Sequence, residues 1–382
     1  MNKIKIIHIL DSLCIGGMEN LVIDVCNNLD TNKFDICILT LSNDELTQKI
    51  KLNANIRLRT LPYKRTDIMS PFFLLKHFIE IARIIKSESP QIVHTHIYQC
   101  RLFPLLFSIK YACKKAKHFH TIHTSGIHYD NISFWHYIKL VIERCCYKYC
   151  KTNLIAVSEN VYEKCYPLLK KSYNNFIVIN NGVDLNKFNR ENFTQMNHKP
   201  NSYFNIVYVS RLHPGKNHIT LLKSIKNLSI KYPSIKLHIV GDGILKDKIN
   251  KYVTDNGLSE FVEMHGERND VEKVISICQI GVFPSEYEGL SIALLEMMAM
   301  KLPIVCSDIP SFRKILVDEN NALFFKTHSH EDLFNCIEKL FISTNLRNKY
   351  AISSYEIANK YSLKKMISDY ETFYTQVYTN NK

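Results

Sequence analysis

Residues 279–299 read QIGVFPSEYEGLSIALLEMMA: a short apolar run, a polar loop that contains Gly289, and then an apolar helical pattern. Glu288 falls in the loop before the predicted helix, and Glu296 falls about two turns into it. The start of a helix adds unpaired backbone N–H groups and the positive end of the helix dipole, which together suit an anionic diphosphate. An acidic first turn on an ordinary amphipathic helix remains the alternative interpretation of these two glutamates.

Strand-like runs alternate with helical patterns on both sides of this segment. The first series is IKIIHIL, FDICILTL, QIVHTHI, HFHTIHT and LIAVS, and the second is NIVYVS, IKLHIVGDG, FVEMHG, QIGVFPS and LPIVCSD. Such alternation predicts an α/β fold of parallel sheets covered by helices on both faces, with ligands at the carboxyl ends of the strands. An Asn-rich irregular stretch after Asp184 is a linker candidate. We therefore expect two Rossmann-like domains, 1–190 and 191–361, with a C-terminal helix over about 362–382 that packs back on the first.

Composition narrows the class of protein without choosing a function. The 382 residues are 46% hydrophobic and 22% charged, which is typical of a globular enzyme. The first residues lack the pattern of a secretion signal, and no run of about 18 apolar residues predicts a membrane span, so we expect a cytoplasmic protein. Twelve scattered cysteines favour reduced thiols over a metal site. The net charge of +13 attracts anions of any kind.

A second charged segment follows the first strand of the second half. In YVSRLHPGKN, Arg211 and Lys216 lie on a Pro-Gly loop, where two cations can neutralise the charge that builds on a departing nucleoside diphosphate. A solvated basic turn is the alternative. VGDG at 240–243 adds a glycine turn from strand to helix, which is a weak signal by itself. Three other polar residues favour structural roles: His94, Ser158 as a helix N-cap and Asp184 as an Asx turn.

Eight short segments in one order are more specific than any of them alone. They are Gly16-Gly17-Met18-Glu19, HTH at 94–96, TIHTS around His123, VSEN at 157, NNGVD at 180, SRLHPGKN, VGDG and the Glu288/Glu296 element. Over nearly the whole chain this set resembles the family 4 retaining glycosyltransferases of GT-B fold. The resemblance implies two Rossmann-like domains facing each other across a donor-binding cleft, with the N-terminal domain on the acceptor side.

The resemblance also implies roles for residues of the C-terminal half. Arg211 and Lys216 would hold the donor diphosphate, and Glu296 would bind the ribose hydroxyls. Glu288 would lie near the reacting carbon of the transferred sugar. The backbone around Gly289 and Leu290 would contact sugar hydroxyls or phosphate, and Glu267 and Arg268 would lie near the base.

In the N-terminal half, His123 would contact the donor sugar and complete a catalytic set with Glu288, Arg211 and Lys216. Gly16 and Gly17 would let the first strand–helix loop approach the phosphates without a Cβ atom in the way. We find no Asp-x-Asp element of the kind that chelates a divalent ion, so we expect no metal and no cofactor. The nucleotide-sugar is then the substrate, and its departing phosphate oxygen could take the proton of the acceptor hydroxyl.

The resemblance does not identify the substrates. We expect transfer of a hexosyl or N-acetylhexosaminyl group from a UDP-sugar, with GDP-mannose second, to a glycan or lipid-linked acceptor in bacterial surface polysaccharide synthesis. The predicted helix from Ser70 to Ser87 is apolar beyond one core stripe, so it is either a buried interdomain helix or a contact with an anionic membrane, helped by the basic stretch Lys110 to Lys117.

Three other functions fit the sequence less well. A sugar-nucleotide epimerase of the same fold would also need a diphosphate site, but the Glu288/Glu296 spacing with the Arg/Lys loop disfavours it. A nicotinamide dehydrogenase would need G-x-G-x-x-G after the first strand, and SLCIGGMEN does not provide it. A basic nucleic-acid-binding protein is supported by net charge alone, so we expect no nucleic acid partner.

Overall fold

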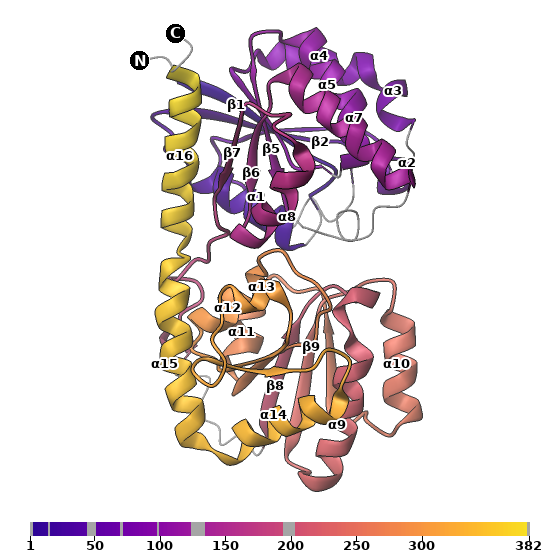
Figure 1. The fold of residues 1–382 in the computed structure, drawn as a ribbon, viewed down its shortest axis with the longest axis vertical. Helices are drawn as coiled ribbons and strands as arrows, with labels where there is room; N and C mark the ends of the chain where they lie inside the picture. Colours follow the sequence, from indigo (N-terminus) through magenta and orange to yellow (C-terminus); the bar gives the residue numbers. More distant parts are fainter. Residues whose placement is uncertain are drawn as a thin grey trace. The chain divides into compact units, whose positions relative to one another are not determined.

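The computed structural model describes residues 3–13, 16–43, 51–68, 72–97, 99–123, 134–193 and 203–379. The chain divides into two compact units, Met1–Asn181 with Met366–Lys382, and Gly182–Lys365. Each described unit is a parallel sheet with helices on both faces (Figure 1). The α/β fold class predicted from the alternating pattern is confirmed.

The sheet of the first unit has seven described strands in the order β3-β2-β1-β4-β5-β6-β7. Side chains alternate along β1, so that Ile7 and Ile9 enter one core layer while His8 points to the opposite face. Helices α4, α5 and α7 lie on one side of the sheet and α16 on the other (Figure 1). The elements are β1 Ile4–Leu10, α1 Gly17–Asn28, β2 Phe34–Thr40, β3 Arg57–Thr60, α2 Arg65–Ile68, α3 Phe73–Lys76, α4 Phe78–Glu88, β4 Ile92–Thr95, α5 Gln99–Ala112, β5 Lys117–Ile122, α7 Phe134–Cys150, β6 Asn153–Ala156, α8 Glu159–Leu169, β7 Asn175–Val178 and α16 Leu363–Thr379.

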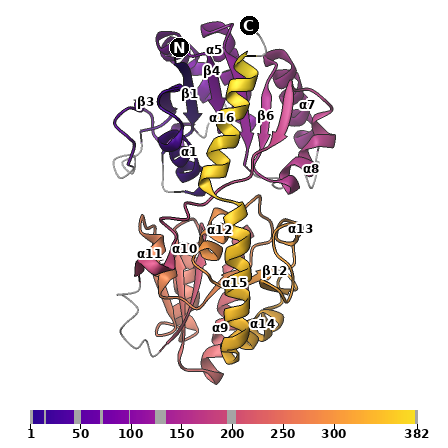
Figure 2. The same ribbon diagram turned by 90° about the vertical axis from the view of Figure 1, so that its left-hand side faces the viewer.

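Helix α16 begins in the second unit and continues into the first from Met366 (Figure 2). Its buried Tyr374 packs edge-on against Phe34 and Phe119, from β2 and β5. Glu371 accepts a hydrogen bond from the backbone N–H of Asp30 at 2.7 Å. The last helix therefore closes one face of a sheet that begins at residue 4.

The sheet of the second unit has six described strands in the order β10-β9-β8-β11-β12-β13. Gly241, directly after β9, has φ +133°, and a Cβ there would lie 2.0 Å from the carbonyl oxygen of Ser210. The glycine turn in VGDG thus lets two strand ends approach each other closely. The elements are β8 Phe204–Val209, a 3-10 turn Pro214–Lys216, α9 His218–Lys231, β9 Ile235–Val240, α10 Lys246–Asp255, β10 Val262–Gly266, α11 Val271–Ser276, β11 Ile280–Phe283, α12 Ile292–Ala299, β12 Ile304–Ser307, α13 Pro310–Arg313, β13 Ala322–Phe325, α14 His330–Ile342 and α15 Thr344–Lys360.

The unit boundaries differ from the expected ones at 190 and 361. Residues 182–190 belong to the second unit because Phe188 is buried in its core and Val183 pairs with Ser362. A Cβ on Gly182 would lie 2.8 Å from the carbonyl oxygen of Ser362, so the chain segments around Gly182 and Ser362 pack closely against each other. The linker expected after Asp184 begins as packed structure, and its residues 194–202 lie outside the described part of the chain.

The predicted helix from Ser70 to Ser87 is two helices. Residues 70 and 71 lie outside the described residues, α3 ends at Lys76, and α4 starts at Phe78. His77 stands between them with φ −100° and ψ 11°, packed against the ring of Tyr63. Among the described residues, no helix combines the length and apolar character needed to cross a membrane.

Candidate functional site

The charged residues predicted in the second unit meet where Lys216 approaches Glu288. The ammonium of Lys216 contacts Glu288 Oε1, and the two side chains are 21% and 11% exposed. Lys216 ends the 3-10 turn after β8, and Glu288 lies between β11 and α12. Because β8 and β11 are adjacent and parallel, their carboxyl ends bring these two loops to one edge of the sheet.

Three contacts hold the two loops in register. The hydroxyl of buried Tyr208 donates to the carbonyl oxygen of Lys216 at 2.8 Å and lies 3.3 Å from Ser285 Oγ. The backbone N–H of Glu286 donates to the carbonyl oxygen of Gly215 at 2.9 Å. A Cβ on Gly215 would lie 2.5 Å from the ring of Tyr287. Packing between the two loops therefore holds Lys216 beside Glu288.

The other predicted residues of this segment lie around that contact. Arg211 is exposed on the loop that follows β8. Helix α12 starts at Ile292, one residue after Ser291, whose side chain accepts a hydrogen bond from the N–H of Leu294. Glu296 is consequently just over one turn into the helix, where two turns were predicted, because the loop is longer than the pattern indicated.

Gly289 is partly exposed and Leu290 is buried in the core of the unit. Glu267 and Arg268 follow β10, whose last residue, Gly266, accepts a hydrogen bond from the N–H of Gly241 at 2.8 Å. Arg268 is held by Asp270 at 2.8 Å. These residues thus share the carboxyl edge with the loops after β8, β9 and β11.

In the first unit, Gly16 and Gly17 lie at the start of α1, with Gly16 as its N-cap. A Cβ on Gly16 would lie 2.3 Å from Glu19 Oε2. That carboxylate is the far end of a flexible side chain and the backbone of Gly16 is extended, so this contact alone does not require a glycine.

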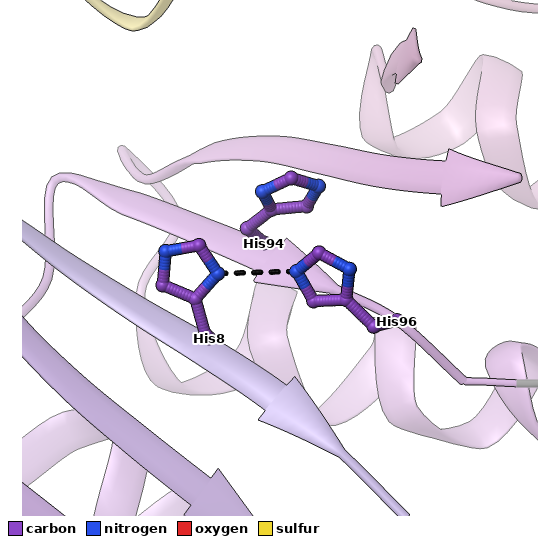
Figure 3. Close-up of side chains that lie close together, drawn as sticks. All are labelled: His8, His94 and His96. Carbon is purple, nitrogen blue, oxygen red and sulfur yellow. Dashed lines mark hydrogen bonds between the residues drawn. The ribbon is translucent and has the colours of Figure 1, made fainter. Parts of the chain in front are cut away.

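His123 follows β5 at the carboxyl edge of the first sheet and is half-buried. Its Nε2 lies 3.2 Å from His96 Nδ1, and burial lowers the pKa of His123 to about 4. His96 Nε2 in turn lies 3.1 Å from His8 Nδ1 (Figure 3). Sequence reasoning singled out His123 and missed His8, because the pairing of β1 with β4 that brings His8 beside His94 cannot be read from one strand.

The expected structural residues have structural contacts. His94 is fully buried, with Nδ1 2.6 Å from the hydroxyl of Tyr374 and Nε2 2.8 Å from Thr121 Oγ1. Ser158 caps α8 by accepting from the N–H of Val161, and Asp184 Oδ1 accepts from the N–H groups of Asn186 and Lys187. The structural interpretation of all three is confirmed.

Two groups among the described residues have the donor atoms of a metal site. In the first, His8, His94 and His96, both ring nitrogens of His94 already have the partners given above. In the second, His238, Glu263 and His265, the carboxylate of Glu263 faces the ammonium of Lys236 at 3.5 Å. A cation would have to break these contacts. Cys146 and Cys150 are buried on α7, and burial raises their thiol pKa values to about 12 and about 11.

Comparison with known proteins places this chain in a family. Residues 15–187 match the model of Glycosyltransferase Family 4, and residues 189–356 match that of Glycosyl transferases group 1. The chain belongs to glycosyltransferase family 4. It is a glycosyltransferase, and its two parallel-sheet units are those of the GT-B fold.

Two relatives of this glycosyltransferase align along most of its length. An Escherichia coli protein named UDP-Gal:alpha-D-GlcNAc-diphosphoundecaprenol alpha-1,3-galactosyltransferase is 26% identical over 99% of this chain and 98% of that protein. The Staphylococcus aureus capsular polysaccharide biosynthesis glycosyltransferase CapH is 26% identical, with 89% of each chain covered.

Solved structures share the fold. A glycosyltransferase from Rickettsia africae aligns over all of both chains with a TM-score of 0.79 and 20% identity. Anabaena HepE in complex with UDP-glucose aligns over 97% of this chain and 99% of its own, with a TM-score of 0.80 and 16% identity.

Proposed function

We propose that this glycosyltransferase is a retaining enzyme that transfers a sugar from a UDP-sugar to a lipid-linked or glycan acceptor in bacterial surface polysaccharide synthesis. The observation that carries the proposal is the pairing of Lys216 with Glu288 at the carboxyl edge of the second sheet. A cation held there faces the ligand position that parallel sheets of this kind use. The contacts between the packed loops hold it in place.

The proposed reaction breaks the bond between the anomeric carbon and the donor phosphate oxygen, and forms a bond from that carbon to the acceptor oxygen. The acceptor hydroxyl proton passes to the departing phosphate oxygen, so the products are the glycosylated acceptor and a nucleoside diphosphate. Arg211 and Lys216 stabilise the charge that grows on the diphosphate. Glu288 lies near the reacting carbon.

The remaining roles concern binding. Glu296 accepts hydrogen bonds from the ribose hydroxyls, and the backbone at Gly289 and Leu290 contacts sugar hydroxyls or phosphate. Glu267 and Arg268 lie near the base. In the first unit, His123 contacts the donor sugar, and the loop that ends in Gly16 and Gly17 approaches the phosphates.

The choice of substrates rests on the relatives. The printed names of the Escherichia coli protein and of a Campylobacter jejuni relative, 28% identical over 43% of this chain, both describe transfer to an undecaprenol-linked diphosphate. HepE binds UDP-glucose. We therefore favour a UDP-sugar over GDP-mannose, and a lipid-linked acceptor over a free glycan.

A donor panel tests the proposal. Thermal shifts with UDP, GDP and their sugars should select UDP-sugars, and a radiolabelled donor should transfer its label to an undecaprenyl-diphosphate-linked sugar with retained anomeric configuration. Isomerisation of the donor without transfer would instead support an epimerase. Inverted product would reject the retaining assignment.

We also propose that the reaction needs no metal ion. The charge of the diphosphate is met by Arg211 and Lys216, so turnover should persist in EDTA. Loss of turnover that magnesium or manganese restores would contradict this assignment.

An exposed apolar face of the first unit supports a peripheral membrane location. We define it as Phe72, Leu75, Ile79, Phe107, Tyr111, Phe134, Tyr137 and Tyr149, all exposed on or beside α3, α4, α5 and α7. The ring of Tyr111 contacts Phe78, and Phe107 stacks on Tyr149, so the four helices contribute to one surface. Lys76 on α3, Lys148 on α7 and Lys114, just after α5, are exposed as well. Apolar side chains bordered by lysines suit the surface of an anionic bilayer.

Vesicle sedimentation tests this location. The wild-type protein should sediment with anionic vesicles at low salt, and the double variant Ile79→Glu/Tyr111→Glu should stay in the supernatant. Ile230→Glu, on α9 of the second unit, is the matched control because Ile230 is equally exposed. Equal recovery of wild type in the supernatant with anionic and neutral lipid would reject the membrane contact.

A further inference from the structure

Three imidazoles form a hydrogen-bonded chain in the first unit. His8 Nδ1 lies 3.1 Å from His96 Nε2, and His96 Nδ1 lies 3.2 Å from His123 Nε2. Figure 3 shows the first of these contacts, with His94 beside it. The chain runs from the middle of β1 to the residue that follows β5. His94 is outside it, because its two ring nitrogens bind Tyr374 and Thr121.

Each ring of the chain carries one proton at neutral pH. Burial lowers the pKa of His8 to about 3 and that of His123 to about 4, and it lowers the pKa of His96 well below the usual range. A neutral imidazole has one N–H donor and one acceptor nitrogen. Two hydrogen bonds between three such rings therefore allow only two proton arrangements, with every proton on Nδ1 or every proton on Nε2.

The inner end of the chain distinguishes the two arrangements. His8 Nε2 is buried and has no hydrogen-bond partner among the described residues. With every proton on Nε2, this end would be a buried N–H without an acceptor, which is rare in proteins. With every proton on Nδ1, the end is an unused lone pair. The second arrangement leaves the Nδ1–H of His123 as a donor at the carboxyl edge of the sheet.

We infer that His96 is a positioning residue: its Nδ1–H donates to His123 Nε2 and thereby holds His123 in the tautomer that presents its Nδ1–H to an oxygen of the donor sugar. This inference rests on the proposed contact between His123 and the donor. His8 fixes the direction in which the three rings donate, because its Nε2 has no acceptor among the described residues. A nitrogen that donates selects a hydroxyl or ring oxygen with a free lone pair.

Nitrogen-15 NMR of the full chain measures the tautomer directly. Selectively labelled histidine, with His123 assigned through His123→Asn, should show Nδ1 of His123 as the protonated nitrogen in the wild type. His96→Leu removes the donor and should convert His123 to a mixture of tautomers, whereas His96→Asn keeps an amide donor and should restore the Nδ1–H form. Protonated Nε2 on wild-type His123 would overturn the inference.

The unpartnered Nε2 of His8 gives a second expectation, for a variant that should leave the tautomer of His123 unchanged. In His8→Leu the chain shortens by one ring, and the buried lone pair moves to His96 Nε2. The tautomer of His123 should therefore not change. A switch of His123 to the Nε2–H form in this variant would show that a buried nitrogen without an acceptor does not set the direction of donation.

Kinetics connect the tautomer with transfer. His96→Leu should lower kcat/KM for the donor about tenfold, the effect of one hydrogen bond, and His96→Asn should recover most of it. In the His123→Asn background the same substitution should have no further effect, because the two residues act through one contact. Additive losses would overturn the coupling. His118→Asn is the matched control: His118 is as buried but bonds to Thr95 and Thr152.

Failure of the proposed donor contact of His123 and failure of the positioning role of His96 give different results. If His123→Asn leaves transfer unchanged, the proposed donor contact of His123 is wrong, while the NMR arms still test the tautomer. If His123→Asn slows transfer but His96→Leu changes neither tautomer nor rate, the donor contact stands and the positioning role is wrong. Matched thermal melts establish that each variant is folded.

Discussion

The carboxyl edges of the two sheets use different chemistry on the same architecture. In the first unit, the strand ends bring together buried imidazoles with lowered pKa values, including His96 and His123. In the second, they bring together a lysine, an arginine and carboxylates, with Lys216 against Glu288. A neutral edge can orient hydroxyl groups, while a charged edge can stabilise a diphosphate. One βα framework thus presents two kinds of strand edge.

The largest expected difference between the two units is in their stability at acidic pH. Six described histidines of the first unit have lowered pKa values, against three in the second; the first six are His8, His94, His96, His118, His120 and His123, and the other three are His218, His238 and His265. The unfolded chain binds protons below pH 6.5 while the folded rings stay neutral, so stability falls as pH falls from about 6.5 towards about 3. A fully buried ring whose folded pKa is about 3, such as His8 or His120, costs about 1.4 kcal/mol at pH 5.5.

Hydrogen exchange followed by mass spectrometry measures this difference unit by unit. Peptides of the first unit should lose protection at a higher pH than peptides of the second. If peptides of the second unit lost protection at the higher pH, the proposed difference between a neutral edge in the first unit and a charged edge in the second would be wrong.

Substitution of Lys216 should cause the largest kinetic loss. Lys216→Ala removes a cation from charge that grows as the glycosidic bond breaks, so kcat should fall about a hundredfold or more, and Arg211→Ala should behave similarly. Steady-state kinetics provide the measurement. Lys231→Ala is the matched control, since Lys231 pairs with Glu338 at 2.7 Å at the far end of α9. An unchanged kcat with a raised KM would reassign Lys216 to ground-state binding.

A smaller and different effect is expected for Glu296. The hydrogen bonds that we propose between Glu296 and the ribose hydroxyls would exist before and during the reaction, so Glu296→Ala should raise the donor KM about tenfold and affect kcat less. Glu296→Gln keeps an acceptor oxygen and should recover part of the affinity. If Glu296→Ala abolishes kcat instead, the separation between binding and leaving-group stabilisation within the second unit is wrong.

The smallest expected effect concerns the closing helix of the first unit. Tyr374→Phe removes the hydroxyl that lies 2.6 Å from His94 Nδ1 and should lower the free energy of unfolding by about 1 kcal/mol. Urea unfolding is the measurement, with Tyr111→Phe on the exposed surface as the control. Equal effects of the two substitutions would mean that the buried bond adds no net stability.

Strands buried on both faces could be predicted from the sequence, and most edge strands could not. β1 and β8 are mostly apolar, and their limits lie within one residue of the predicted runs IKIIHIL and NIVYVS. The missed strands, β3, β7 and β13, each lie at an edge of a sheet. β3 and β7 have few buried side chains, whereas β13 is mostly buried but only four residues long. In β3 the sequence RLRT places charges on a half-exposed strand, and no apolar period marks it.

The same limit applies to the sites. Lys216 and Glu288 could be predicted because each lies in a loop directly after a strand of the βα series. The chain from His8 to His123 depends on which strands are neighbours and in what register, such as His8 beside His94. A side chain in the middle of a strand carries no such positional signal. The break of the predicted helix lies at His77, whose ring packs against Tyr63, a tertiary contact that the sequence does not show.

Helix α16 also bears on how the protein is made. The first unit contains β1, which begins at Ile4, but Tyr374, which covers the buried histidines, is synthesised only after all of the second unit. Residues 182–365 contain all of the second unit and are synthesised in one stretch. The unit translated first must therefore wait, with one sheet face only partly covered, while the unit translated second can finish folding. A chaperone that protects the nascent chain should bind the N-terminal half for longer than the C-terminal half.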